Sequence, residues 1–488
     1  MYCICLIASI LLGTILHVPG DYATIQAAID ASTDGDTVLV SPGTYCEYID
    51  FSGKAIVVTS AEGWESTTIK VDEFSSTGIV EFCSEEDSSS VLSGFKIRSD
   101  AGAGPIGIYC EMSSPVIENN CIYSCNGSYE PIGGGIACYS GSPRIIGNLI
   151  EENYSIRYGG GLLLDNCTGA SVSGNVFLSN ACGGAYMGGS GLGGGLAVKD
   201  CDSIMVRNNV FASNEAHGNS YPLPATGVGG GIYVNWSSNV LIENNTVVDN
   251  WARDYGGGVS VVSSNSSCTV MNLIVFDNSC TIFSYGWQIY SLNESFLSYS
   301  DVENWEDTLN VYGELIIGDG MMDIDPGFES GPLSDYHLSA LSPCIDGGNP
   351  DNQYNDPEDP GNPGYALWPS LGLIRNDMGA YGGGGAEQFV SVGDTGSYES
   401  MEDWDLEVSP NPFKETQTVS FRVQAGRDIE LAVYDLSGRR VDIICTGSVS
   451  GGEHSVNWVP DDQVRSGCFL IVLSSENEKR TCRTVLLR

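Results

Sequence analysis

The chain has 488 residues, which predicts two or more domains or one long repeat array. It holds 62 acidic against 20 basic residues, a net charge of −42, and this excludes a nucleic-acid binder held by phosphate contacts. The 42% of hydrophobic residues excludes wholesale disorder, and the 62 glycines favour strands and turns over helices.

The chain opens with an apolar run from Ile4 to Leu16, which ends before Pro19 and Gly20. The run is too short to span a membrane comfortably, so residues 1–17 are interpreted as a signal peptide. It is atypical, because no Lys or Arg precedes the run and no Ala-x-Ala site follows it. We therefore expect a secreted protein.

The middle of the chain is periodic. A glycine triplet recurs five times, and an Asn-containing motif follows each triplet. The triplets lie at Gly133–Gly135, Gly159–Gly161, Gly193–Gly195, Gly229–Gly231 and Gly256–Gly258. Apolar residues alternate after each one, at positions +1 and +3 from the last glycine, as in Leu162 and Leu164. This period of two predicts a strand with one buried face.

Such units bury their apolar faces only when they stack. The sequence therefore predicts a parallel β-helix, because propeller blades need four strands each and more uniform repeats. An asparagine ladder is expected along the stack. Its members would be Asn120, Asn148, Asn175, Asn209 and Asn245. Most of the 17 cysteines are interpreted as buried packing thiols.

The segment VPGDYATIQAAIDASTDGDTVLVSPGTYCEYIDFSGKAIVVTS (Val18–Ser60) resembles the cap and first coil of secreted pectate-lyase-like right-handed β-helix proteins. The resemblance implies a capping helix over Tyr22–Ser32. Asp301–Gly384 resembles the closing segment of such proteins, through DIDPGF and NDMGAYGG. We assign residues 18–330 to the β-helix and 331–403 to an acidic closing segment and linker.

Residues 404–488 differ in composition, with 10 basic and 12 acidic residues. The motifs SPNPF, LAVYDLSGRRV, GGEHSVNW and RSGCFLIVL resemble the C-terminal sorting domain of the type IX secretion system. The resemblance implies export and attachment to the cell surface through that secretion machinery. The fold class expected is therefore all-β, a right-handed parallel β-helix followed by a small immunoglobulin-like β-sandwich.

The outward positions of the stacked strands form the first candidate site. Position +4 after the glycines has Glu111, Tyr139, Asp165, Lys199 and Asn235 in successive repeats, and position +2 has Tyr109 and Tyr233. Tyrosines with carboxylates and a lysine suit sugar stacking with acid or base chemistry. The alternative is a solvated face with an Asp165–Lys199 ion pair.

Two long loops form the second candidate site. Ala181–Leu192 and Glu215–Val228 would wall a groove, and they have Tyr186, His217 and Tyr221 as candidate substrate-binding residues. Arg157 and Arg253 flank them, and with Lys199 and Asp165 they are the candidate catalytic residues. The alternative is that the two loops are tolerated insertions without a functional role.

The acidic block before the C-terminal domain predicts calcium, because carboxylates on turns are its preferred ligands. The candidates are Asp319, Asp323, Asp325, Asp351, Asp356 and Asp359. A solvated acidic cap is the alternative.

Together these features predict a secreted, monomeric, surface-attached protein that binds extracellular polysaccharide. Two alternatives stay open, a polysaccharide lyase or hydrolase using the same face, and a non-enzymatic adhesin or surface structural protein.

Overall fold

The computed structural model describes nearly all of the first 386 residues and the strands of the C-terminal domain. The described ranges are 13–72, 78–100, 104–127, 133–184, 189–218, 226–262, 268–281, 285–329, 336–386, 405–409, 414, 416–423, 427–435, 440–449, 452–460, 464, 467–474 and 479–486. The chain forms two compact units, Met1–Gly396 and Ser397–Arg488. The division lies a few residues before the expected boundary at 404.

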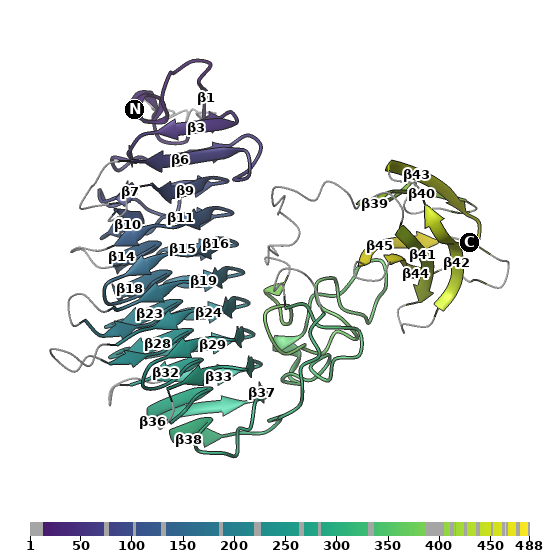
Figure 1. Ribbon diagram of the computed structural model, residues 1–488. Coiled ribbons are helices and arrows are strands. Elements are labelled where there is room, and N and C mark those ends of the chain that lie inside the picture. The colour runs from purple at the N-terminus through teal and green to yellow at the C-terminus, as the bar shows by residue number, and fades with distance from the viewer. Residues whose placement is uncertain are drawn as a thin grey trace, which may run out of the picture. The chain divides into compact units, whose positions relative to one another are not determined.

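The first unit is a parallel β-helix, visible in Figure 1 as a column of stacked arrows. A complete coil has up to four short strands, and each strand pairs in parallel with its counterpart in the next coil. The strands therefore form four stacks that run along the column. The first stack follows the glycine triplets, and the other three follow it in chain order.

The first stack comprises β4 (Ile49–Asp50), β7 (Gly78–Phe82), β10 (Ile106–Glu111), β14 (Ile136–Gly141), β18 (Leu162–Cys167), β23 (Leu196–Lys199), β28 (Ile232–Asn235), β32 (Val259–Val261), β36 (Ile289–Ser298) and β38 (Val311–Ile317). The second comprises β1 (Ile15–Val18), β2 (Thr37–Val40), β5 (Val57–Ser60), β8 (Val91–Ser93), β11 (Val116–Glu118), β15 (Arg144–Ile146), β19 (Ser171–Ser173), β24 (Met205–Arg207), β29 (Val240–Glu243) and β33 (Cys268–Met271). The long strands β36 and β38 complete both stacks.

The third stack comprises β3 (Gly43–Cys46), β6 (Thr67–Val71), β9 (Lys96–Ser99), β12 (Cys121–Tyr123), β16 (Leu149–Glu151), β20 (Val176–Leu178), β25 (Val210–Ala212), β30 (Thr246–Val248), β34 (Ile274–Phe276) and β37 (Asp301–Val302). The fourth comprises β13 (Asn126–Gly127), β17 (Tyr154–Ser155), β21 (Ala181–Cys182), β26 (Glu215–Ala216), β31 (Trp251–Ala252) and β35 (Ser279–Cys280). A separate pair joins β22 (Gly191–Leu192) and β27 (Gly227–Val228).

The predicted alternation produces the core. Leu162, Leu164, Leu196 and Val198, at positions +1 and +3, are fully buried, and one continuous apolar cluster extends from Leu16 to Val302. The second and third glycines of each triplet have no room for a side chain. A Cβ on Gly194 would lie 2.5 Å from the carbonyl oxygen of Gly230 in the next coil. The triplets therefore allow close coil-to-coil approach.

The predicted asparagine ladder is present. Each member from Asn120 to Asn209 donates from Nδ2 to Oδ1 of the asparagine in the next coil, over 2.9–3.2 Å. Each Oδ1 from Asn148 to Asn245 also accepts the backbone N–H of the preceding member. These bonds satisfy side-chain and turn backbone groups that are removed from water.

A second ladder, not predicted, lies at the corner before the glycines. Its side chains are bonded in the same way over 2.7–3.0 Å. Its members are Asn153, Asn180, Asn214, Asn250, Asn278 and Gln288. Its asparagines pack against the third glycines, as Asn180 does against Gly161.

The N-terminal end is capped as expected. The helix α1 (Ile25–Ala31) begins after Thr24, whose side chain accepts the N–H of Ala27, and its residues Ile25, Ala28 and Ile29 are buried. The strand β1 pairs with β2, and its residue Leu16 belongs to the core. The expected signal boundary after residue 17 therefore falls inside a strand of the β-helix, while residues 1–12 lie outside the described residues.

The closing segment is part of the first unit, and three outward asparagines hold it against the coils. Asn208 donates to the carbonyl oxygen of Ala380, Asn244 donates to that of Asp377, and Asn272 accepts the N–H of Asn349, over 2.8–2.9 Å. All three have positive φ, between 49° and 57°. The segment includes the 3₁₀ turn η1 (Asn352–Tyr354). It is thus a docked part of the β-helix unit.

The second unit is the expected antiparallel sandwich. One sheet has the order β39-β40-β43 and the other β42-β41-β44-β45. Its core includes Val419, Leu431, Trp458 and Ile471. The strands are β39 (Asp405–Ser409), β40 (Gln417–Val423), β41 (Arg427–Asp435), β42 (Arg440–Val449), β43 (Gly452–Trp458), β44 (Gly467–Ser474) and β45 (Lys479–Leu486).

The cysteines that the structure describes are free thiols, and most of them are buried, as predicted. No helix in the described part of the chain is long and apolar enough to cross a membrane.

Substitutions of the adjacent residues Asn119 and Asn120 test the contribution of the asparagine ladder to stability. Replacing the buried Asn120 with Gly should lower the free energy of unfolding by about 2–3 kcal/mol, since it leaves buried backbone groups unpaired. Asn119→Gly is the control, because Asn119 is exposed with a φ of 54° that glycine adopts freely, and it should change stability by less than about 0.5 kcal/mol. Urea denaturation measures both, and equal losses would contradict the ladder's role.

Candidate functional site

The +2 column of the first stack is covered, where an exposed face was expected. Tyr109 is 9% exposed and Tyr233 only 4%. They lie in an apolar cluster with Leu192 and Val228, the residues that directly precede two of the glycine triplets. The chain therefore folds back over this column where Leu192 and Val228 precede their triplets, so the two tyrosines are packing residues with little surface for a ligand.

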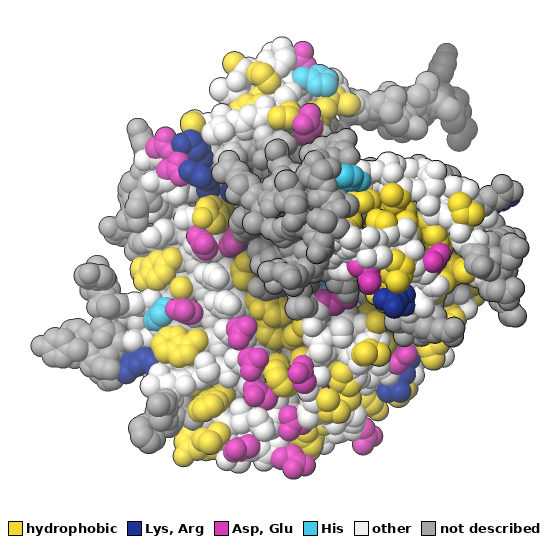
Figure 2. All heavy atoms as spheres, turned by 45° about the vertical axis from the view of Figure 1, so that its right-hand side comes forward, with side chains coloured by type: hydrophobic (Ala, Val, Ile, Leu, Met, Phe, Trp, Pro, Cys, Tyr) yellow, Lys and Arg dark blue, Asp and Glu magenta, His cyan; other side chains and the backbone are white. Residues whose placement is uncertain are grey.

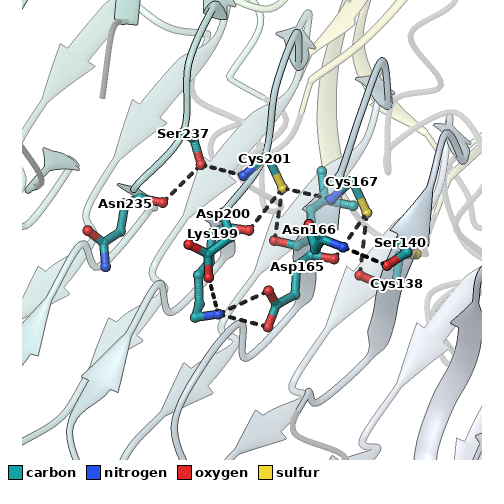
Figure 3. A network of polar contacts seen from close by, with 11 residues as sticks. Cys138, Ser140, Asp165, Asn166, Cys167, Lys199, Asp200, Cys201, Asn235 and Ser237 are labelled. Atoms are coloured by element: carbon teal, nitrogen blue, oxygen red, sulfur yellow. Dashed lines mark hydrogen bonds and ion pairs between the residues drawn. The ribbon is translucent and has the colours of Figure 1, made fainter. Parts of the chain in front are cut away.

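The +4 column places Lys199 between two carboxylates. Its Nζ lies 3.0 Å from Asp165 Oδ1 and 2.5 Å from Asp200 Oδ2 (Figure 3). Partial burial favours the neutral amine, but hydrogen bonds to Asp200 and Asp165 outweigh it and raise the pKa of Lys199. The amine is therefore protonated at neutral pH, which removes the general-base role from Lys199. The alternative of an Asp165–Lys199 ion pair is confirmed.

A column of cysteine and serine side chains lies beside this ion pair. The backbone N–H of Cys167 donates to Cys201 Sγ over 3.3 Å, and the N–H of Cys201 donates to Ser237 Oγ over 3.0 Å (Figure 3). As in the two asparagine ladders, a backbone N–H of one coil donates to a side chain of the next coil at this third turn. The network around Lys199 is thus fully accounted for by coil stacking.

The other residues of the +4 column keep some exposure. Glu111 accepts a hydrogen bond of 3.2 Å from the Tyr109 hydroxyl, and the Tyr139 ring lies 5.8 Å from that of Tyr109. Asn235 is half-buried, and Trp236, directly after it, is exposed. The column therefore offers scattered polar groups and no continuous platform.

The long-loop edge brings together four outward side chains on β26, β31 and the residues after them. His217 Nε2 lies 2.8 Å from Glu215 Oε2, and its ring centroid lies 5.3 Å from that of Trp251. Arg253 follows His217 in the next coil. Tyr186 and Tyr221 lie outside the described residues.

The two candidate catalytic arginines are far apart. Tyr158, Leu192, Val228 and Tyr255 occupy one position in successive coils, so Arg157 and Arg253 are separated by three coil steps, roughly 14 Å. The Arg157 guanidinium lies 4.9 Å from the centre of the Tyr158 ring. The two arginines therefore do not lie on neighbouring coils.

Four tyrosines that sequence reasoning missed form the most continuous aromatic surface. The tyrosine cluster consists of Tyr255, Tyr285, Tyr290 and Tyr312. Successive rings stack with centroid separations of 4.7 Å for Tyr255–Tyr290, 5.8 Å for Tyr290–Tyr312 and 4.9 Å for Tyr285–Tyr312. Tyr285 is 45% exposed and Tyr312 38%, whereas burial raises the pKa of the inner Tyr290. The cluster thus has a packed base and an accessible edge.

A signal for this cluster exists in the sequence. Tyrosine directly precedes the triplets at Gly159 and Gly256, and Tyr285 precedes Gly286, where the segment GWQ takes the place of a triplet. Gly286 has the positive φ of the first glycines, and Tyr290 stands at position +2 like Tyr233. Extending the repeat to this degenerate copy would have located the cluster.

The candidate calcium ligands are dispersed. Oxygens of Asp323, Asp325 and Asp359 accept backbone N–H groups over 2.8–2.9 Å. Among the described residues, the hydrogen bonds of Asp319 and Asp351 do not involve the other candidates. In the same part of the chain, no group of three or more His, Cys, Asp or Glu side chains is placed to hold a metal ion. Calcium binding stays a prediction.

Asp356 is held differently from the other candidates. It is buried in the closing segment, where its carboxylate accepts the backbone N–H groups of Asp377 and Gly383. Burial, with the nearby Asp377 carboxylate, raises the pKa of Asp356 to about 9, and burial raises that of Asp377 to about 8. Both carboxyl groups are packed within the closing segment.

The comparisons agree with this architecture. Residues 44–202 and 190–314 match the model of the right handed beta helix region. This chain belongs to the right-handed β-helix family. No curated protein matches it.

Among solved structures, the β-helix chain is similar to the pectin methylesterase PemA from Erwinia chrysanthemi, at 8% identity and a TM-score of 0.27, over 66% of this chain and 93% of that one. It is also similar to a pectin methylesterase in complex with a hexasaccharide, at 8% identity and 0.27, over 62% and 80%. A third is a mutant of the PL6 family alginate lyase AlyGC, at 12% and 0.28, over 83% and 61%.

The buried pair Asp356 and Asp377 predicts the pH dependence of stability. Their folded-state pKa values of about 9 and about 8 exceed the unfolded value of about 3.9, so the folded protein holds protons that the unfolded chain releases. The free energy of unfolding should therefore fall as pH rises from about 5 to about 9.

Melting curves of the wild type and of Asp356→Asn across that pH range measure this effect. The variant should lose about half or more of the pH dependence, because one of the two titrating groups is gone. Asp351→Asn, an exposed carboxylate of the same segment, should leave the slope unchanged. A wild-type melting temperature that rises toward pH 9 would contradict the assignment.

Proposed function

We propose that this β-helix protein binds an extracellular polysaccharide through the tyrosine cluster. The observation that carries the proposal is the run of stacked rings from Tyr255 to Tyr285, with two half-exposed members on a rigid scaffold. Tyrosine combines an apolar ring with a polar hydroxyl, which suits the apolar faces and hydroxyl groups of sugars.

The scaffold supports this role in two ways. The rings are supplied by consecutive coils and by the turn before β36, so their spacing follows the coil repeat of about 4.8 Å, close to the length of one sugar residue in an extended chain. The inner rings are already packed, so little side-chain entropy is lost when a ligand binds. A linear polymer lying along the β-helix would contact the two half-exposed tyrosines, Tyr285 and Tyr312.

The site supports binding better than it supports cleavage. A lyase that uses Lys199 as its base needs a neutral amine, and two carboxylates keep this amine protonated. The contact of Glu215 with His217 beside Trp251 is the strongest candidate for acid or base chemistry, but one carboxylate falls short of the pair that glycoside hydrolysis requires. A non-enzymatic adhesin or surface structural protein would differ from a polysaccharide-binding protein only because it has no affinity for glycans.

We further propose that the protein is exported and attached to the cell surface through residues 404–488. The support is the resemblance of the segments around Ser409–Phe413 and Leu431–Val441 to type IX sorting domains, together with the antiparallel sandwich that these residues form. Deleting residues 404–488 in the producing cell should leave the β-helix unit unexported.

Substitutions in the cluster test the binding proposal. Tyr285→Ala and Tyr312→Ala should each weaken binding to a cognate polysaccharide about two- to tenfold, the value of losing one aromatic contact. The double variant should lose more, and Tyr285→Phe should retain most of the affinity.

Affinity gel electrophoresis of the full chain in a panel of soluble polysaccharides measures this. The matched control is Tyr365→Ala, which removes an equally exposed tyrosine from the closing segment and should leave binding unchanged. A wild-type protein that binds no polysaccharide, or a control that weakens as much as Tyr285→Ala, would refute the proposal.

A further inference from the structure

We infer that the polysaccharide bound at the tyrosine cluster is uncharged, in contrast to uronate polymers. The inference rests on the proposed function and specifies its ligand class. It is carried by the charge of the β-helix unit and by the way its few cations are used.

The unit is strongly acidic. Residues 1–403 contain 50 acidic and 10 basic residues, so a polyanion approaching this surface is repelled over most of it. Figure 2 shows one face on which acidic side chains outnumber basic ones and lie among hydrophobic patches. Repulsion of this kind slows encounter as well as weakening the complex.

The ten cations are all described, and most are engaged in the fold. Lys54 donates to three carbonyl oxygens around the end of α1, at Ile29, Asp30 and Ser32. Lys70 pairs with Asp72 and Asp100. Three others are engaged by ion pairs or hydrogen bonds, Arg98 with Asp100, Lys199 with Asp165 and Asp200, and Arg375 with the Gly348 carbonyl. Arg207 lies beside Glu243 in the register of neighbouring coils.

Two of the remaining cations lie over aromatic rings. Lys96 Nζ is 4.8 Å from the centre of the Tyr123 ring, and the Arg157 guanidinium is 4.9 Å from that of Tyr158. Arg144 and Arg253 complete the set. Only Arg253 belongs to the same coil as a member of the tyrosine cluster, and Asp254 follows it directly.

A uronate polymer has one carboxylate on each sugar residue, so it needs cations repeated along its path. The cluster has none in its ring stacks, and Glu314 lies two residues beyond Tyr312 on the exposed strand β38. Each carboxylate placed against these rings would lose water without gaining a partner. An uncharged sugar loses no ionic hydration there, and its C–H face packs on the tyrosine rings.

The experiment compares polymers that differ mainly in charge. The full chain is run in affinity gels that contain neutral polymers (xyloglucan, galactomannan, mixed-linkage β-glucan), anionic polymers (polygalacturonate, alginate) or cationic chitosan. Fully methyl-esterified pectin is the matched neutral partner of polygalacturonate. Each gel is run at low and high salt, with and without calcium, for the wild type and the Tyr285→Ala/Tyr312→Ala variant.

The inference predicts that at least one neutral polymer retards the wild type, independently of salt, and that the double variant loses this retardation. Affinity for any uronate polymer should be at least tenfold weaker than for that neutral polymer, with or without calcium. Retardation by uronates alone, lost in the double variant, would overturn the uncharged ligand while the tyrosine site survives.

Two other outcomes are separated by the same gels. No retardation by any polymer, or retardation that the double variant retains, refutes the proposed function and the inference with it. Retardation by chitosan alone that disappears at high salt would mean simple attraction to the acidic surface, and it would also overturn the inference.

Discussion

The structure depends on one constraint, the equal register of successive parallel coils. Stacking places identical positions directly above one another, so every buried polar group must find its partner in the coil above or below. Asparagine meets this demand, because one amide donates and accepts along the stack, as between Asn148 and Asn175. The glycine triplets meet a second demand, since Gly194 and Gly230 approach too closely for side chains.

The same register turns single residues into columns on the outside. The +4 column joins Asp165 to Lys199, and the tyrosine cluster joins Tyr290 to Tyr312. A surface site in this fold therefore arises from side chains that recur at one position over neighbouring coils. The cluster lies where the repeat degenerates, because the segment around Gly286 has large residues in place of glycine. Exposed aromatic surface is thus present at the end of the array, where large residues replace the glycines.

Surface charge and surface stacking act together in the proposed function. The acidic unit uses its few basic residues mostly to neutralise neighbouring carboxylates or to bind carbonyl groups, as Lys54 does at the end of α1. What remains for a ligand is apolar ring surface rather than ionic contact. The closing segment adds acids without adding cations near the cluster, and its buried pair Asp356–Asp377 is accommodated in the protonated state.

The sequence by itself determined the β-helix, its inward columns, its first asparagine ladder, the capping helix and the terminal sandwich. The β-helix, its inward columns and its ladder follow from a period of two and recurring glycine and asparagine motifs, which specify the residues that face inward. The capping helix and the sandwich were expected from resemblance to known families. Only the tertiary structure decided which outward residues stay exposed. Tyr109 and Tyr233 are covered in an apolar cluster that Leu192 and Val228 complete. The closing segment docks on Asn208, Asn244 and Asn272 from more than seventy residues away. Tyr285 and Tyr312 stand at different positions of their repeats, so although the degenerate repeat marks Tyr285 in the sequence, their ring contact follows only from where the coils place them.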